Sequence, residues 1–102
     1  MRTLYHPKTE EIELPTVLYA LSDPIRLELL RHVLKCKEMA CGEYATDIPK
    51  STMSHHFKVL RESGVMNTRL AGTQRFMSVR KDELDSRFPG LLDAIVRASE
   101  SN

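Results

Sequence analysis

Cysteine, glycine and proline are all scarce in this sequence. Its 102 residues include two cysteines, four glycines and five prolines. So few glycines and prolines exclude a low-complexity or collagen-like chain, and two cysteines are too few for a disulfide framework. Hydrophobic residues make up 41% and charged residues 28%, which is typical of a globular domain and argues against global disorder. We therefore expect a single domain over residues 1–102.

Long hydrophobic runs are absent too. The longest stretch without a charge, Leu14–Ser22, has nine residues, whereas a membrane-spanning helix needs about 20. Glu10, Glu11 and Glu13 precede it, and no apolar segment of the signal-peptide kind is present. These absences predict a cytoplasmic protein with reduced thiols and no membrane partner.

The sequence also lacks the short motifs of common enzymes. It contains no glycine-rich phosphate loop, no nucleophile elbow and no HExxH zinc motif. A domain of this size leaves little room for both a deep active site and the core that supports it. We expect no enzyme and no cofactor.

Charge is nearly balanced overall, at +1, but it is unevenly distributed. Residues 1–49 carry a net charge of −2, residues 50–80 carry +5, and residues 81–102 carry −2. A basic segment between two acidic ones resembles the electrostatic footprint of a nucleic-acid-binding surface. A solvated basic face without a partner would give the same pattern.

Hydrophobic spacing and capping residues predict mainly α-helix with one small β-hairpin. Asp23 and Pro24 are typical of a helix start, Ser51 is a second expected N-cap, and Gly64 is an expected C-terminal stop. The expected elements are an arm at 1–10, helices at 15–21, 24–36, 41–47 and 51–63, strands at 65–70 and 74–79, a turn of helix at 82–85 and a last helix beginning at Pro89 and ending at about Ser99.

The same spacing assigns side chains to faces. Arg26 on the second helix and Arg61 on the fourth are expected to face solvent, whereas His56 is expected to point partly inward. In the short helix at 41–47, Tyr44 and Ala45 are the expected inward residues. Two short helices joined by a tight turn indicate a helix-turn-helix, and the hairpin that follows makes the order α-α-α-α-β-β-α that of a winged helix-turn-helix.

Two separated motifs carry a family resemblance. The first is Leu21-Ser22-Asp23-Pro24-Ile25-Arg26-Leu27 with Leu30, and the second runs Ser51-Thr52-Met53-Ser54-His55-His56-Phe57-Lys58-Val59-Leu60-Arg61-Glu62-Ser63-Gly64-Val65. Together they resemble the ArsR/SmtB family of bacterial transcriptional repressors, over about 14–96. The resemblance implies a homodimer that binds an inverted-repeat operator in double-stranded DNA and releases it when an inducer arrives.

A helix that enters the major groove needs short polar side chains near its N-terminus. The fourth predicted helix has them, and the hairpin adds basic residues that could reach the neighbouring backbone. The expected DNA contacts are Lys50, Ser51, Thr52, Ser54, His55, Lys58, Arg69, Gln74 and Arg75. For His56, which matches the family's motif histidine, we expect a structural or phosphate-bonding role.

The last helix, placed at 88–99 with Phe88 included, carries a wider apolar band than a monomer of this size needs at its end. The family resemblance implies a two-fold interface between the first and last helices. The expected interface residues are Val17, Leu18, Leu91, Leu92, Ile95 and Val96.

The sensor sites of the family are incomplete in this chain. The arsenic-type pair Cys-x-Cys is reduced to the single Cys41, and the zinc-type site on the last helix retains Asp93 but has no histidine. We therefore expect no metal at either place.

Cys36 and Cys41 remain as a candidate redox or inducer site. Near a helix N-terminus Cys41 would have a lowered pKa and a reactive thiolate. With His32 on the same face as Cys36, and His6 from the arm, the thiols could instead ligate zinc or copper. A purely structural role for both cysteines is the third interpretation.

A competing hypothesis is a winged helix that binds only protein and carries its basic face incidentally. The exposed side chains expected over 51–61 are hydrophilic and basic, whereas protein-docking surfaces use aromatic and aliphatic anchors. This favours a DNA-binding regulator.

Overall fold

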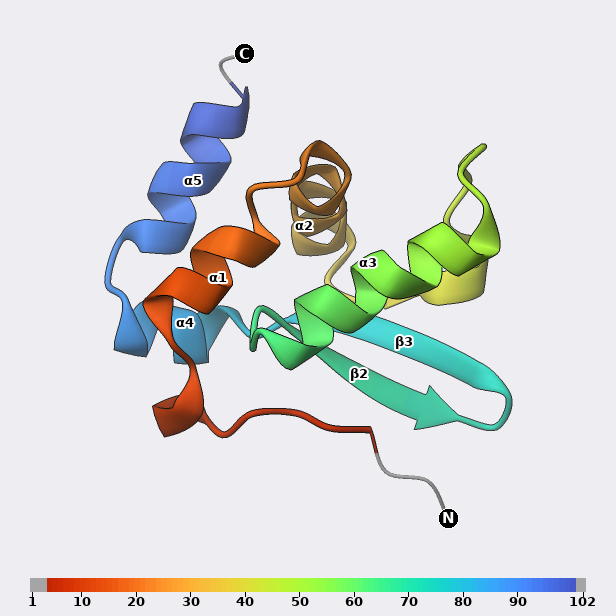
Figure 1. The fold of residues 1–102 in the computed structure, drawn as a ribbon, viewed down its shortest axis with the longest axis horizontal. Coiled ribbons are helices and arrows are strands. Elements are labelled where there is room, and N and C mark those ends of the chain that lie inside the picture. Colours follow the sequence, from red (N-terminus) through yellow and green to blue (C-terminus); the bar gives the residue numbers. More distant parts are fainter. Residues whose placement is uncertain (1–3, 101–102) are drawn as a thin grey trace.

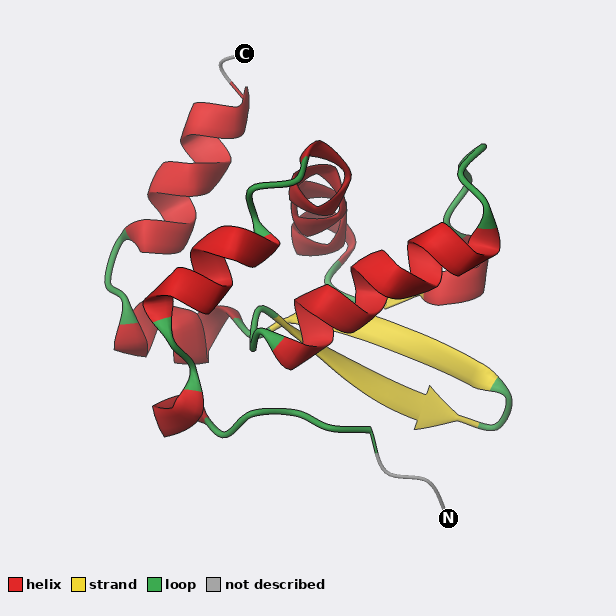
Figure 2. Ribbon diagram, in the orientation of Figure 1, coloured by secondary structure: helices red, strands yellow, loops and turns green. Residues whose placement is uncertain are grey.

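The computed structural model describes residues 4–100 as five α-helices, three strands and two single turns of 3-10 helix (Figures 1 and 2). The elements are η1 (Thr9–Glu11), α1 (Leu14–Ala20), α2 (Pro24–Cys36), β1 (Met39–Ala40), η2 (Cys41–Glu43), α3 (Lys50–Glu62), β2 (Met66–Ala71), β3 (Gln74–Val79), α4 (Lys81–Arg87) and α5 (Leu91–Glu100).

The start of α2 follows the capping rules. The carboxylate of Asp23 accepts hydrogen bonds from the backbone N–H groups of Ile25 and Arg26, at 2.8 and 3.2 Å. These two donors belong to the first helical turn and have no partner within the helix. Pro24 occupies the first helical position, where a missing N–H costs nothing. The prediction for this helix is confirmed.

The sheet is antiparallel with the order β1-β3-β2. In the hairpin, Met66 pairs with Val79 and Ala71 pairs with Gln74, so only Gly72 and Thr73 form the connecting turn. Gly72 has φ +63, the left-handed conformation that such turns require. The predicted hairpin is confirmed, and β1 is an addition: Met39 pairs with Met77 on the other side of β3.

The core lies between the helices and one face of the sheet. Side chains from Ile12, directly after η1, to Leu92 on α5 enter it, because each helix has one apolar stripe and the strands alternate. Its largest fully buried members are Ile12, Val17, Leu29, Leu30, Val33, Leu60, Val65, Met66 and Met77.

The expected helix at 41–47 is wrong. Only the single turn η2 forms there, after which the chain continues as an irregular segment to α3. Glycine, threonine and aspartate in this stretch all have low helix propensity. Tyr44 is half-buried as predicted, but Ala45 is exposed.

Two helix starts also differ from prediction. Pro49 is the N-cap residue of α3, and no side chain caps the helix, so Ser51 lies inside the first turn. The turn of helix expected at 82–85 is the seven-residue α4, and the last helix begins at Leu91 because Pro89 and Gly90 lie in the connection.

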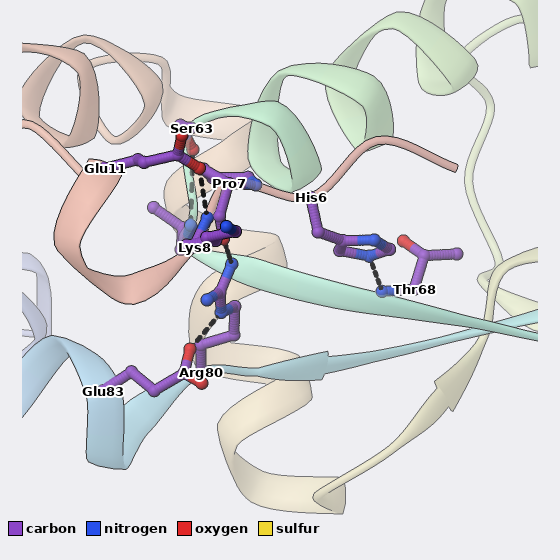
Figure 3. A network of polar contacts seen from close by, with 9 residues as sticks. His6, Pro7, Lys8, Glu11, Ser63, Thr68, Arg80 and Glu83 are labelled. Atoms are coloured by element: carbon purple, nitrogen blue, oxygen red, sulfur yellow. Dashed lines mark hydrogen bonds and ion pairs between the residues drawn. The ribbon is translucent and has the colours of Figure 1, made fainter. Parts of the chain in front are cut away.

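The described part of the N-terminal arm, which begins at residue 4, lies along β2 (Figure 3). Residues 1–3 of the predicted arm lie outside the described residues. Nε2 of His6 accepts the backbone N–H of Thr68 at 2.9 Å. Arg80 donates to the carbonyl of Pro7 at 2.8 Å and also pairs with Glu83. The arm therefore has a defined position beside an edge strand.

Gly64 ends α3 in the left-handed region, with φ +89, as the sequence predicts. A Cβ built on it would lie 2.6 Å from Cγ1 of Ile12, a residue that is 1% exposed. Two constraints thus require glycine here, the backbone conformation and the close approach of η1.

We predict that Gly64→Ala lowers the free energy of unfolding by more than about 1 kcal/mol, because alanine is strained at this φ and displaces Ile12. Urea unfolding followed by circular dichroism measures the change. Gly42→Ala is the matched control, since a Cβ at Gly42 meets nothing within 4 Å and its φ is not positive. Equal stability of the two variants would contradict the prediction.

Candidate nucleic-acid interface

Helix α3 has two distinct faces. Met53, His56 and Leu60, spaced three and four residues apart, are buried against the rest of the domain. The opposite face carries short polar and basic side chains, all exposed: Lys50, Ser51, Thr52, Ser54, His55 and Lys58.

The β2–β3 hairpin projects beside α3 (Figure 1). Arg69, Gln74 and Arg75 are exposed on it. All nine residues expected to contact DNA thus lie at the surface, six on α3 and three on the hairpin.

A groove separates the helix from the hairpin. Ser54, Phe57 and Lys58 line it from α3, Arg75 lines it from β3, and Cys41 lies between them. Its volume is about 450 Å³. We refer to it below as the helix–hairpin groove. Its Lys58 and Arg75 side chains give it a positive charge, which suits a phosphate group.

Arg69 is the one expected contact that already has an ionic partner. Its guanidinium binds both oxygens of the Glu38 carboxylate, at 2.8 and 3.1 Å, and lies over the Phe76 ring at 4.6 Å. The hydrogen bond from Arg69 lowers the pKa of Glu38. This pair ties the hairpin to the segment that precedes β1.

Two arginines expected in solvent are buried. Arg61, at 8% exposure, donates from Nε to the carbonyl of Tyr5 at 3.2 Å. Arg26, at 5%, lies between α1 and α3. Sequence periodicity treats every arginine as polar, but a guanidinium can be buried when backbone carbonyls satisfy its donors.

His56 is buried, as expected from its spacing. Burial lowers the pKa of His56; Asp23 opposes that shift, while Arg26 and His55 add to it. The folded protein therefore favours the neutral imidazole.

The two cysteines are free thiols. Cys36 is exposed on the last turn of α2, and Cys41 is half-buried in η2. Burial raises the pKa of Cys41, although Arg75 opposes the shift. The expectation of a lowered pKa is wrong, because the predicted helix is reduced to one turn and has no helix dipole to stabilise a thiolate.

No group of three or more His, Cys, Asp or Glu side chains within residues 4–100 could hold a metal ion. His6 is an unsuitable fourth ligand, because Nδ1 contacts the Leu4 carbonyl at 3.1 Å and Nε2 binds Thr68. His32 packs edge-on against Tyr44, with ring centroids 5.4 Å apart.

The six residues expected at a dimer interface divide into three groups by exposure. Val17 and Leu92 are 1% and 3% exposed and belong to the domain's own core, so they have no surface left for a partner. Leu18 on α1 is 45% exposed, and Leu14, one turn earlier, is 40% exposed. Leu91, Ile95 and Val96 on α5 are half-buried.

Known proteins resemble the chain in sequence and in structure. A helix-turn-helix domain family matches residues 21–69. An uncharacterised HTH-type transcriptional regulator of Bacillus subtilis (strain 168), YceK, is 38% identical over 82 residues, covering 78% of this chain and 82% of that protein. The arsenical resistance operon repressor of Staphylococcus xylosus is 36% identical over 75 residues, covering 72% and 71%.

Among solved structures, the ArsR family transcriptional regulator RHA00566 superposes with a TM-score of 0.67, covering 79% of this chain and 90% of that one. At 23% identity this likeness shows the fold.

The fold and the exposed face of α3 define a winged helix-turn-helix DNA-binding protein. The identity to the two curated regulators then places it in a family: the chain belongs to the ArsR/SmtB-type transcriptional regulators. Regulators of this family are not enzymes. None of the helices described is long and apolar enough to cross a membrane.

The pKa of His56 gives a pH-dependent stability. An unfolded histidine takes up a proton near pH 6.5, at about its ordinary pKa, whereas folded His56 resists it. The unfolded chain then binds more protons, so stability is present above that pH and falls as pH drops below it, until the lower folded pKa is reached.

We predict that the melting temperature of the wild type falls more than that of His56→Asn when the pH is lowered from about 7.5 to about 5.5. Asparagine does not titrate, and the other three histidines are common to both proteins. Parallel pH profiles would show that His56 has the same pKa folded and unfolded.

Proposed function

We propose that the protein is a homodimeric repressor that binds an inverted-repeat operator, with α3 in the major groove and the hairpin on the adjacent backbone. The observation that carries the proposal is the exposed polar and basic surface shared by α3 and the hairpin. The arsenical resistance operon repressor, 36% identical, supports repression as the direction of control.

Short side chains on α3 suit base-edge contacts. Ser51, Thr52 and Ser54 let the helix approach the groove floor closely, and His55 and Lys58 extend further. Arg75, across the helix–hairpin groove, suits the phosphate backbone. No large apolar side chain is exposed on α3, which disfavours a protein-docking role for this face.

A second copy of the chain is the proposed partner of α1. Leu14 and Leu18 lie one turn apart and together expose a leucine stripe to water. A two-fold axis at this stripe would pair it with itself and would repeat α3 on the other half of the DNA site. The inverted symmetry of the operator would follow from the symmetry of the dimer.

In this proposal, either an inducer or oxidation of a cysteine thiol causes the repressor to release the operator. Cys41 lines the helix–hairpin groove beside Ser54 and Lys58. A peroxide would oxidise the Cys41 thiol to a sulfenic acid and would itself be reduced to water or an alcohol. The oxygen added to the sulfur would occupy space that the DNA backbone needs. Exposed Cys36 is the more accessible thiol, but it lies on α2, away from this groove.

The proposed DNA surface predicts a specific electrostatic signature. Lys58→Ala and Arg75→Ala should each weaken binding to labelled DNA from upstream of the protein's own gene, and each should reduce the slope of log K against log salt by about 1. Fluorescence anisotropy at several salt concentrations measures both quantities. Lys35→Ala, an exposed position on α2, is the control. An unchanged slope in both variants would contradict the phosphate contacts.

The proposed dimer predicts an effect of charge on α1. Leu18→Glu should convert the dimer to a monomer at micromolar concentration, because a carboxylate would be buried without a partner in the interface. Analytical ultracentrifugation gives the mass. Leu70→Glu, on β2, replaces a leucine of nearly the same exposure, 46% against 45%, and should leave the dimer intact. Dissociation of both variants, or of neither, would argue against an interface at α1.

A further inference from the structure

His56 and Arg26 form a contact between α3 and α2 that the proposed DNA surface does not use. Nη1 of Arg26 lies 3.1 Å from Nδ1 of His56. Both side chains are more than nine-tenths buried, at 5% and 6% exposure. A buried pair of this kind imposes a definite hydrogen-bond arrangement.

Arg26 is held in place from the other side. Its Nε donates to the carbonyl of Ala20 at 2.7 Å, and Nη2 donates to the carbonyl of Tyr19 at 3.4 Å. The guanidinium also lies 5.3 Å from the centre of the Tyr19 ring. The end of α1 therefore fixes the direction in which Nη1 points.

This geometry determines the tautomer of His56. A guanidinium has five N–H donors and no acceptor. Nδ1 of His56 must therefore accept from Arg26, and the ring proton of the neutral imidazole must lie on Nε2. The lowered pKa of His56 keeps the ring neutral near pH 7.

The Nε2–H group has no partner within residues 4–100, where Nδ1 makes the only hydrogen bond found for this ring. Among the described side chains, no fully enclosed nitrogen or oxygen is left without a partner. Nε2 therefore reaches the protein surface. The residue as a whole is only 6% exposed, and Arg26 binds its Nδ1, so this edge offers a single donor in a fixed direction.

We propose that Nε2–H of His56 donates to a backbone phosphate oxygen of DNA, and that Arg26 is the positioning residue that fixes the donor. The assignment rests on the DNA-binding function proposed above. A phosphate is the fitting acceptor, because a side chain flush with the surface cannot extend to base edges on the groove floor, whereas the backbone passes over the protein surface.

Two variants distinguish the role of the Nε2–H donor of His56 from that of the buried hydrogen bond between Arg26 and Nδ1 of His56. In His56→Asn, Oδ1 can replace Nδ1 as the acceptor for Arg26, but no N–H remains at the position of Nε2. In His56→Gln, the side-chain amide can reach the position of Nε2, but Arg26 loses its acceptor. We expect the asparagine variant to be stable and weak in DNA binding, and the glutamine variant to be less stable and tighter in binding than the asparagine variant.

The probe is a fluorescein-labelled duplex of mixed sequence, about 30 base pairs long, at low salt. His56→Asn should bind it about 10-fold or more weakly, since hydrogen bonds to charged groups are the strong ones. For His56→Asn the slope of log K against log salt should equal that of the wild type, because a neutral donor releases no counterion. The unchanged slope distinguishes the neutral contact of His56 from the charged contact of Lys58, whose removal should reduce the slope. His32→Asn, an exposed histidine on α2, should match the wild type.

Nitrogen-15 NMR of the imidazole provides the independent readout. The free wild type at pH 7.5 should show His56 as the Nε2–H tautomer, and Arg26→Met should lose that preference. The Nδ1–H tautomer in the wild type would overturn the positioning role of Arg26, even if the Arg26 variant does not fold.

The outcomes distinguish this inference from the function on which it rests. If the wild type binds the duplex and folded His56→Asn binds it equally well, the phosphate assignment is wrong and the proposed function stands. If the wild type does not bind any duplex, including DNA from upstream of its own gene, the phosphate assignment and the proposed DNA-binding function are both wrong.

Discussion

The arrangement of the helices depends on one buried cation. The guanidinium of Arg26 donates to two carbonyls at the end of α1, while its own backbone belongs to α2 and its Nη1 donates to His56 on α3. A buried charge is tolerated only when its donors are satisfied, so these three helices can move relative to one another only by breaking charged hydrogen bonds. The position of α3, and with it the surface offered to DNA, follows from that constraint.

A second constraint acts on the C-terminal end of α3. Gly64 turns the chain sharply and lets Ile12 pack where any side chain would stand. Arg26 holds α3 at its middle, through His56, and Gly64 holds it at its C-terminal end. The exposed face of the helix makes no contribution to the core. Residues on that face are thus free to vary for recognition without a large effect on stability.

Most elements of this domain can be predicted from the sequence, because capping and periodicity are local. Asp23 marks the start of α2, Gly64 marks the end of α3, and the alternation of side chains marks the two strands of the hairpin. Strand β1 could not be predicted, since two residues carry no period and pair only with a distant strand. The exposed positions on α3 were predictable from helical spacing, whereas burial of Arg26 and Arg61 was not, because their carbonyl partners are set by the tertiary fold.

The arm that lies along β2 has a consequence for solubility. Strand β2 is at the edge of the sheet, and an edge strand with unpaired N–H groups invites a strand of another molecule to add to it. The imidazole of His6 occupies one such N–H, that of Thr68, with a side chain that cannot continue a ladder of backbone hydrogen bonds. The arm thus blocks edge-to-edge aggregation at that position.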